Sequence, residues 1–275
     1  MMTTHPLERS LVIRAPRAIV FRYFTDPARF ALWWGEGSSI DGRVGGDVRI
    51  RHPNAVVACG TVEAIEPDRR IVFTYGYENS HPELPPGSSL VTIELDDHAD
   101  GTLLRFRHDL PSADMRDKHV PGWRYHLAVF ANVVANEQNA GVAATIDRWF
   151  EAWAEADGGR RRELLAACTT DDVALRDRFS CLNGRDELHG HIANTHVHVP
   201  GLVMRRSGEP RHCQGTVLFD WSAEGPDQKP MANGTNVARL DADGRIDIVA
   251  VGRQTQNVRI YWNQTEASAS TTETR

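Results

Sequence analysis

Residue-by-residue alternation of apolar and polar side chains is the feature that most constrains how this chain folds. Val48 and Ile50, for example, alternate with Arg49 and Arg51. Side chains that alternate in this way point to opposite faces of a β-strand, so one face covers a core and the other meets water. Six segments of the first half are predicted to be strands: residues 7–14, 48–51, 56–66, 71–77, 91–95 and 104–107. They predict an antiparallel sheet.

Three helices are predicted around these strands. Pro16 suits the first turn of a helix that runs through Phe24, and Asp26 caps a second, short helix that starts at Pro27. A long helix is predicted to begin at Pro121, because one apolar stripe follows it: Trp123, Leu127, Phe130 and Val134. A strand, short helices, antiparallel strands and a final long helix form a helix-grip arrangement of the α+β class.

The second half begins with helices and ends with strands. One face of its first predicted helix carries Ile146, Trp149, Phe150 and Trp153, and this helix is expected to stop at residues 158–159. Further helices are predicted around Leu164 and at residues 184–195. Strands are predicted at residues 173–178, 202–206, 213–221, 231–240 and 246–252. This order is typical of a cone-shaped α+β barrel.

The length of 275 residues suits two domains, since a typical domain has about 150 residues. The polar segment 136–141 separates the two patterns and is the expected linker. We therefore predict domains at residues 1–138 and 139–262. Residues 263–275 are rich in Thr, Ser, Glu and Ala and are predicted to be a disordered tail.

An ordered set of short motifs in the first half resembles a known family. The motifs are Ala15-Pro16, Phe24-Thr25-Asp26-Pro27, Trp33-Trp34, Gly45-Gly46 and Pro121-Gly122-Trp123. Over about residues 7–136 they resemble START-type (SRPBCC) domains, most closely the branch named after activators of the heat shock protein 90 ATPase. The resemblance implies a cavity between the long helix and the sheet, and it implies no shared catalytic residues. Trp33 and Trp123 are candidate ligand contacts there, with packing in the core as the alternative.

A second set of motifs lies at about residues 140–253. It consists of Trp149-Phe150, Thr170-Asp171-Asp172-Val173, Asn183-Gly184-Arg185, Gly234-Thr235-Asn236 and Asp243-Gly244-Arg245-Ile246. This set resembles the SnoaL-like branch of the nuclear transport factor 2 superfamily. That superfamily includes ketosteroid isomerases, polyketide cyclases, dehydratases and pure binding domains, so the fold alone leaves the function open.

The resemblance to isomerase-type members implies roles for three residues. Asp177 takes the place of the general base, on the strand before the Gly-Arg turn. Trp149 stands where those members have an oxyanion tyrosine, and its indole N–H donates a hydrogen bond without acting as an acid. Asn236 stands where they have a protonated aspartic acid, and its amide also donates. The departures at Trp149 and Asn236 weaken the case for steroid-type isomerisation.

Asp177 is a candidate from its own sequence context as well. The alternation places its carboxylate on the apolar side with Val173 and Leu175, where an unpaired charge is costly and burial raises the pKa of an acid. The alternative is an ion pair with an arginine, either Arg176, Arg178 or Arg206. Small residues around Asn236 leave room for a ligand. We therefore predict that Asp177, Asn236 and Trp149 line one cavity.

Four histidines fall within ten residues of the second half. His196 and His198 share a face if their segment is a strand, and with a carboxylate such a pair binds metal. A helix, however, places His189 and His191 about 200° apart, so no metal site and no cofactor are predicted. His196 and His198 remain candidate ligand-binding or acid/base groups, with solvated side chains as the alternative. Trp221, at the end of a predicted strand, is a further candidate ligand contact.

Charge and composition exclude several classes of function. The chain carries 31 basic and 37 acidic side chains and neither half is basic, which argues against a nucleic-acid partner. No apolar signal segment and no run of about 18 apolar residues occurs, so a cytoplasmic protein without a membrane partner is expected. The four cysteines are scattered and are expected to be reduced, buried thiols. No phosphate-binding or dinucleotide motif occurs.

These features predict a protein that binds small hydrophobic or polycyclic metabolites. Any catalysis would be metal-free acid/base chemistry of the isomerase, cyclase or dehydratase type in the second domain, and whether the chain is an enzyme stays open. One alternative is a non-enzymatic protein, with a chaperone-associated or regulatory first domain and a second domain that binds ligand and forms a homodimer. Another is a structural oligomer with filled cores.

Overall fold

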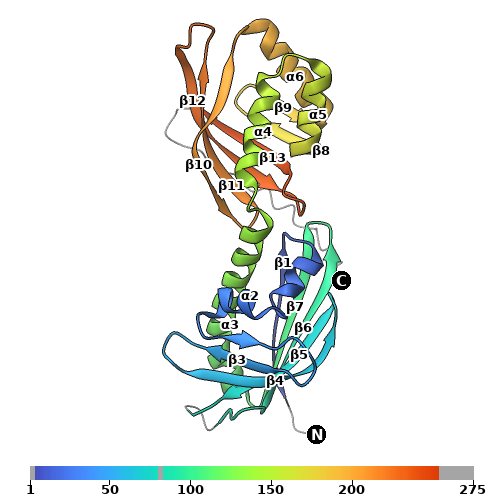
Figure 1. Cartoon of the computed structure of the whole chain (residues 1–275), viewed down its shortest axis with the longest axis vertical. Coiled ribbons are helices and arrows are strands. Elements are labelled where there is room, and N and C mark those ends of the chain that lie inside the picture. The colour runs from blue at the N-terminus through green and yellow to red at the C-terminus, as the bar shows by residue number, and fades with distance from the viewer. Residues whose placement is uncertain (1–3, 80–82, 254–275) are drawn as a thin grey trace, which may run out of the picture.

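A computed structural model describes residues 4–79 and 83–253, which form a mixed α+β structure with two large sheets. Figure 1 shows the two sheets one above the other along the long axis, with helix α3 (Ala113–Gln138) reaching from the first toward the second. The predicted tail at residues 263–275 lies outside the described residues. Within the described ranges, no helix is both long and apolar enough to cross a membrane.

The first sheet has seven strands in the order β1-β7-β6-β5-β4-β3-β2, and every neighbouring pair is antiparallel. Its strands are β1 (His5–Ile13), β2 (Ser39–Ile40), β3 (Asp47–Arg51), β4 (Val57–Glu66), β5 (Arg70–Tyr77), β6 (Ser89–His98) and β7 (Gly101–Leu110). All six predicted strands are present, whereas the two-residue β2 was not predicted. In β3, Val48 and Ile50 are buried and the arginines are exposed, as the alternation requires.

A glycine inside a strand often marks a bulge, but Gly60 does not, since the register of β4 and β5 shifts between Val62 and Ala64 instead. Glycine is needed at position 60 for a different reason. A Cβ atom there would overlap the carbonyl oxygen of Thr74 on β5. The two backbones therefore approach more closely at this point than any side chain allows.

Helix α3 begins eight residues before the position predicted from Pro121. Its N-cap is Ser112, whose hydroxyl oxygen accepts a hydrogen bond from the N–H of Met115 at 3.2 Å. Met115 is buried against the first core, which stabilises the additional turns. Pro121 is consequently inside the helix, where it donates no backbone hydrogen bond.

Two short helices, α1 (Arg17–Arg22) and α2 (Pro27–Trp34), complete the first half. Asp26 caps α2 as predicted, because its carboxylate accepts from the N–H groups of Ala28 and Arg29. The apolar faces of α2 and α3 meet the concave sheet, and their large side chains, among them Phe30 and Phe130, are fully buried. One continuous core therefore lies between the helices and the first sheet.

The second sheet has six strands in the order β10-β11-β12-β13-β8-β9. They are β8 (Thr169–Arg176), β9 (Cys181–Asn183), β10 (Val203–Cys213), β11 (Thr216–Glu224), β12 (Pro230–Leu240) and β13 (Ile246–Arg253). All pairs are antiparallel except β13 with β8, which is parallel. The strand predicted at residues 213–221 begins only at Thr216, since Gln214 and Gly215 form the turn after β10.

Helices α4 (Val142–Ala154), α5 (Gly158–Cys168) and α6 (Gly184–His198) lie on one side of this sheet (Figure 1). Gly158 and Gly159 were predicted to end the first helix, but they open α5. The reason is the side chain of Asp157, which caps α5 by accepting from the N–H of Arg160 at 2.7 Å. The apolar faces of α4 and α6 and the strands β8, β11 and β12 form a second core, separate from the first.

The two halves meet near the end of α3. The Arg14 guanidinium donates to the carbonyl oxygen of Leu240 at 3.0 Å, and the Gln138 amide donates to that of Ala242 at 2.8 Å. The predicted linker is largely helical, because α3 continues to Gln138 and α4 starts at Val142. The connection between the halves is therefore short.

All four cysteines are free. Cys168 is buried as predicted, and Cys59 is half-buried. Cys181 and Cys213 are exposed, which corrects the expectation that all the thiols are buried. Each of these two lies at an end of its strand, where the sheet no longer covers the side chain.

Candidate functional site

A cavity of about 470 Å³ lies between the helices and the sheet of the second half. Its walls come from α4, α6, β11 and β12 and from the turn after β8. The lining residues are Trp149, Trp153, Leu175, Asp177, Phe179, Ser180, His191, Asn194, Thr195, His198, Val199, Leu202, Met204, Trp221, Asn236 and Val251. A cavity of this size accommodates a small organic ligand.

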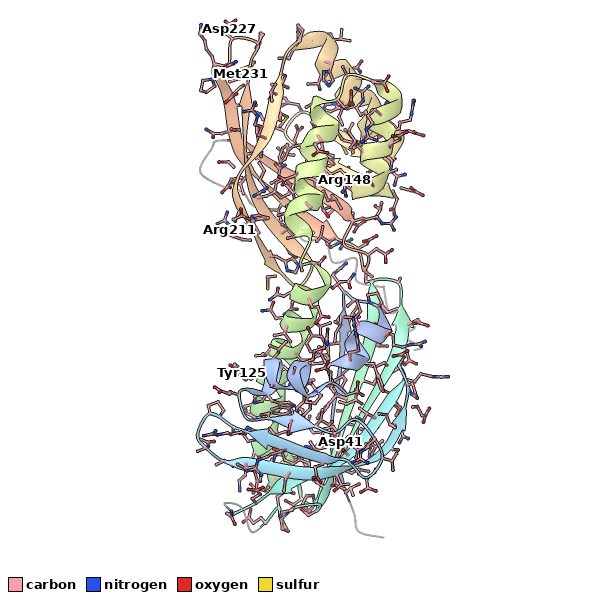
Figure 2. All side chains as sticks on the ribbon, viewed as in Figure 1. Asp41, Tyr125, Arg148, Arg211, Asp227 and Met231 are labelled. Carbon is pink, nitrogen blue, oxygen red and sulfur yellow. The ribbon has the colours of Figure 1, made fainter. Side chains whose placement is uncertain are left out.

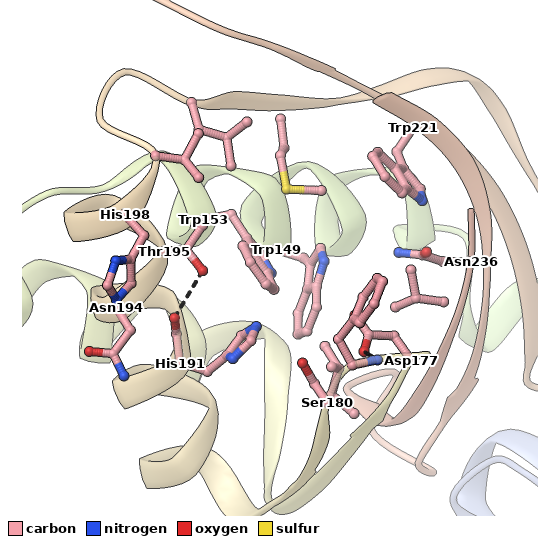
Figure 3. A pocket seen from close by; sticks show the side chains of 16 residues that line it. Trp149, Trp153, Asp177, Ser180, His191, Asn194, Thr195, His198, Trp221 and Asn236 are labelled. Atoms are coloured by element: carbon pink, nitrogen blue, oxygen red, sulfur yellow. Dashed lines mark hydrogen bonds between the residues drawn. The ribbon is translucent and has the colours of Figure 1, made fainter. Parts of the chain in front are cut away.

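The walls of this cavity are largely aromatic. Trp149 and Trp153 are one helical turn apart on α4, and their ring centroids lie 6.0 Å from each other. The ring of His191 on α6 meets that of Trp153 edge-on at 5.8 Å. Figure 3 shows Trp221, Asn236 and Asp177 on one side of the cavity, opposite Asn194 and His198. Flat side chains on facing elements suit a flat, apolar ligand.

Three polar atoms of the cavity walls are buried without a hydrogen-bond partner among the described residues. They are Nε1 of Trp153, Nε1 of Trp221 and Oδ1 of Asn236. Trp221 and Asn236 are each only 3 % exposed. A buried polar group that is left unpaired costs about 1–3 kcal/mol, so such groups are rare unless a ligand or water completes them. Their gathering in one cavity is the strongest local sign of a binding site.

Asp177 lines this cavity together with Trp149 and Asn236, but it is not on a strand as predicted. Strand β8 ends at Arg176, and Asp177 opens a turn in which its N–H donates to the carbonyl oxygen of Ser180. Its carboxylate accepts from the N–H of Phe179 at 2.6 Å. The turn, and not the pleat of β8, therefore directs Asp177 toward the cavity.

The predicted alternative for Asp177 was an ion pair with an arginine. Within the described ranges, Asp177 takes part in no ion pair. Arg206 instead pairs with Asp147, and Arg176 donates to the carbonyl oxygen of Leu182. The carboxylate of Asp177 is half-buried and is left for whatever enters the cavity.

His196 and His198 lie in the last turn of α6 and not on a strand, so the expectation that they share one face of a strand is wrong. In a helix, residues two apart point to nearly opposite sides. His198 lines the cavity, whereas His196 does not and has a buried Nε2 atom without a partner among the described residues. His191, which was weighed in the sequence only as a metal ligand, also lines the cavity. A helix that continues to residue 198 places His191, Thr195 and His198 on one face, and this spacing would have identified His191 as a lining residue.

No group of three or more His, Cys, Asp or Glu side chains in the described part of the chain is placed to hold a metal ion. Independence from metal and cofactor stays a prediction for the protein in solution. The polar groups of the cavity are two amides, three indoles, two imidazoles, two hydroxyls and one carboxylate. This set suits hydrogen bonding and proton transfer.

A second cavity, of about 520 Å³, lies between α3 and the first sheet. Its lining residues are Trp34, His52, Pro53, Asn54, Val56, Tyr75, Tyr77, Glu83, Met115, Lys118, His119, Gly122, Trp123 and His126. Trp123 was a predicted ligand contact and does line it. Trp33 lines neither cavity, since its indole N–H donates to the carbonyl oxygen of Tyr23 at 3.2 Å within the core. Trp33 therefore follows the alternative of packing in the core.

The histidines of this second cavity were not singled out in the sequence. Burial lowers the pKa of His52 to about 4 and also lowers that of His126, while burial raises the pKa of Tyr75 well above its ordinary value. His52 continues the apolar face of Val48 and Ile50 at the end of β3, and His126 stands one turn after Trp123. Both positions fit the periodic patterns, but those patterns were followed only for apolar residues.

Residues 14–135 match the family described as "Activator of Hsp90 ATPase homolog 1-like protein" (AHSA1). An AHSA1-like protein from Rhizobium etli is 32 % identical, covers 48 % of this chain and 82 % of its own length, and has a TM-score of 0.40. This part of the chain belongs to the AHSA1-like family. The second cavity lies within this AHSA1-like domain.

Other solved structures are similar to parts of the chain. A candidate isomerase of the SnoaL-like family from Agrobacterium tumefaciens is 27 % identical over 43 % of this chain and 99 % of its own, with a TM-score of 0.39. The Aha1 dimer from Colwellia psychrerythraea is 17 % identical over 45 % of this chain and 90 % of its own, with a TM-score of 0.39. No curated protein matches the chain.

Proposed function

We propose that residues 139–262 form a SnoaL-like domain that binds a small hydrophobic or polycyclic metabolite, next to the AHSA1-like domain within residues 1–138. The separate sheets and separate cores of the two halves support this division. The observation that carries the binding function is the set of unpartnered polar atoms of Trp153, Trp221 and Asn236 in one aromatic cavity. A flat ring system that carries hydroxyl groups would complete their hydrogen bonds, because a hydroxyl oxygen accepts from an indole N–H and a hydroxyl hydrogen is donated to Oδ1 of Asn236.

We further propose that Asp177 acts on such a ligand as a metal-free general base. Its carboxylate takes a proton from a carbon atom next to a carbonyl group, which leaves an enolate oxygen. The amide N–H of Asn236 and the indole N–H of Trp149 or Trp221 then donate hydrogen bonds to that oxygen. Return of the proton to another carbon atom completes an isomerisation. This division of roles needs no cofactor.

Hydrogen–deuterium exchange at the carbon atoms next to the carbonyl of 2-tetralone tests the proposal, because exchange follows proton abstraction without requiring the natural substrate. We expect the protein to accelerate the loss of the proton NMR signal in D₂O. The variant Asp177→Asn, which keeps the shape but removes the base, should lower this rate by about a hundredfold or more while the affinity for 2-tetralone changes little. Asp172→Asn is the matched control, since Asp172 is exposed on β8 and outside the cavity.

The non-enzymatic alternative is favoured by one specific contact. The bond from the N–H of Phe179 to the Asp177 carboxylate is typical of a turn-stabilising aspartate. If 2-tetralone binds but its exchange rate is the same in the wild type and in Asp177→Asn, the domain binds ligand without catalysis. Dimerisation through this domain belongs to the same alternative, and the mass in analytical ultracentrifugation tests it.

A further inference from the structure

The cavity of the AHSA1-like domain has a chemistry of its own, unlike that of the second-half cavity. Two indole rings and two phenol rings form its apolar walls, contributed by Trp34, Trp123, Tyr75 and Tyr77. The rings are held by one another: Trp34 meets Trp123 edge-on at 5.3 Å, and Tyr75 meets Tyr77 edge-on at 5.5 Å. Their positions are therefore set before any ligand enters.

One hydrogen-bond donor in these walls has no partner. The indole Nε1 of Trp34 is buried, lacks a hydrogen-bond partner among the described residues, and belongs to a side chain that is 3 % exposed. The ring is clamped between Trp123 and His126, with the His126 ring 4.2 Å away. Since the ring is fixed, the unpaired N–H is a standing feature of the cavity and favours a ligand with an acceptor oxygen.

The ring next to Trp34 carries an acceptor. Nδ1 of His126 lies 3.3 Å from the carbonyl oxygen of Trp33. A carbonyl only accepts, so the hydrogen of the neutral ring is on Nδ1, and Nε2 presents a lone pair. Trp34 and His126 together thus offer one donor and one acceptor on adjacent rings. A hydroxyl group satisfies both, because its oxygen accepts from Trp34 while its hydrogen is donated to His126.

The other imidazole and phenol groups of the cavity already have hydrogen-bond partners. His119 donates from Nδ1 to the carbonyl oxygen of Met115 at 2.7 Å and accepts from the Tyr77 hydroxyl at Nε2, 3.1 Å away. The Tyr75 hydroxyl lies 3.3 Å from Nε2 of His52. These contacts leave the pair formed by Trp34 and His126 as the polar anchor of the cavity.

The cavity is also poor in net charge. Its only charged lining groups within the described residues are Glu83 and Lys118, which lie 3.8 Å apart and are both exposed. Burial lowers the pKa of His52 and of His126, and burial raises the pKa of Tyr77, so these two imidazoles and this phenol are neutral near pH 7. A carboxylate brought beside the lone pair of His126 would lose its hydration without gaining a cation.

We propose that this cavity is a second ligand site, selective for neutral aromatic compounds that carry a hydroxyl group, which is held between the Trp34 indole N–H and Nε2 of His126. The site is independent of the cavity around Asp177. Its role is recognition of a ligand and not proton transfer, since burial keeps His52, His126 and Tyr75 neutral near pH 7.

A series of naphthalene probes on the full-length chain tests the proposal. 2-Naphthol presents both a donor and an acceptor, 2-methoxynaphthalene only an acceptor, and 2-naphthoate a charged acceptor. We expect 2-naphthol to bind about fivefold more tightly than 2-methoxynaphthalene, which corresponds to one hydrogen bond, and at least tenfold more tightly than 2-naphthoate. Isothermal titration calorimetry measures these affinities.

The indole N–H signals in ¹⁵N–¹H NMR spectra locate the binding. The signal that disappears in Trp34→Phe belongs to Trp34, and it should move when 2-naphthol is added to the wild type. His126→Phe should abolish the preference for 2-naphthol over 2-methoxynaphthalene, because the acceptor is lost while the ring stays. Tyr125→Phe is the control, because Tyr125 is 64 % exposed and does not line the cavity. Figure 2 shows Tyr125 at the outer edge of α3.

Equal affinity for 2-naphthol and 2-naphthoate, or an unmoved Trp34 signal at saturation, would overturn the proposal. Because the probe series uses the wild type, this result does not depend on whether a variant folds. Movement confined to the signals of Trp149, Trp153 and Trp221 would also overturn it, while leaving the function proposed for the second domain intact. Conversely, if the exchange test shows that Asp177 is not a general base, the proposal for this second site is unaffected.

Discussion

His108 is a fully buried base whose hydrogen bonds permit only the neutral ring. The indole N–H of Trp123 donates to its Nδ1 at 3.0 Å, so its Nε2 carries the hydrogen and donates to the hydroxyl oxygen of Ser89 at 2.9 Å. The Ser89 hydroxyl donates onward to the carbonyl oxygen of Tyr75 at 2.8 Å. Burial, followed by the proximity of His119, lowers the pKa of His108 to about 3.

This lowered pKa makes the stability of the first half depend on pH. An unfolded histidine has a pKa of about 6.5. Above that value neither state binds the proton. As the pH falls below it, the unfolded chain takes up a proton that the folded chain excludes, and stability is lost until the pH reaches about 3. Between pH 7.5 and pH 5 the loss from His108 amounts to about 1.5 pH units, or about 2 kcal/mol.

Urea unfolding of the wild type and of His108→Asn at pH 7.5 and pH 5 measures this contribution. Asparagine places an acceptor oxygen near the former Nδ1 and has no proton to gain. The difference in unfolding free energy between the two pH values should therefore be about 2 kcal/mol smaller in the variant. His98→Asn, at an exposed histidine, is the control. A variant that retains the full pH dependence of the wild type would show that His108 is not the buried neutral base described above.

Three further outcomes are expected. Residues 1–138 and 139–262, expressed separately, should each melt cooperatively in differential scanning calorimetry because each core is built within its own half; a fragment that stays unfolded even with its partner present would contradict the domain boundary. Dialysis against a chelator should leave the melting temperature unchanged and remove no stoichiometric Zn, Fe or Mn, and loss of one metal per chain with destabilisation would refute metal independence. Gly60→Ala should destabilise the chain by more than about 2 kcal/mol, because its Cβ overlaps the Thr74 carbonyl; an unchanged urea midpoint would show that β4 relaxes there.

The strands of this protein were more predictable than the ends of its helices. In β3, a strict alternation leaves a single way to bury Val48 and Ile50 together, so the strand follows from local sequence. The start of α3 does not, because Pro121 is an equally good opening residue. The helix starts at Ala113 because Ser112 caps it and because Met115 is buried against strands that are distant in the sequence. The burial of Met115 is a tertiary contact, which local sequence does not reveal.

The sequence predicted which residues line the candidate site, but not which structural elements carry them. Asp177, Asn236 and Trp149 do line one cavity, yet Asp177 reaches it from a turn whose shape depends on the bond between its own carboxylate and the N–H of Phe179. His196 and His198 were paired through a strand that the structure replaces with the end of α6. The short segment around His196 and His198 has no apolar periodicity strong enough to distinguish a strand from a helix.

The sequence by itself determined the class of fold, the two successive sheet-forming blocks and the apolar faces of their elements. These properties depend on neighbouring residues, and the periods of a strand and of a helix are local. Only the tertiary structure decided which polar atoms were left unpaired inside the protein, such as the indole N–H groups of Trp34 and Trp221. Whether a buried donor finds an acceptor depends on residues far away in the chain, and no local pattern records that distance.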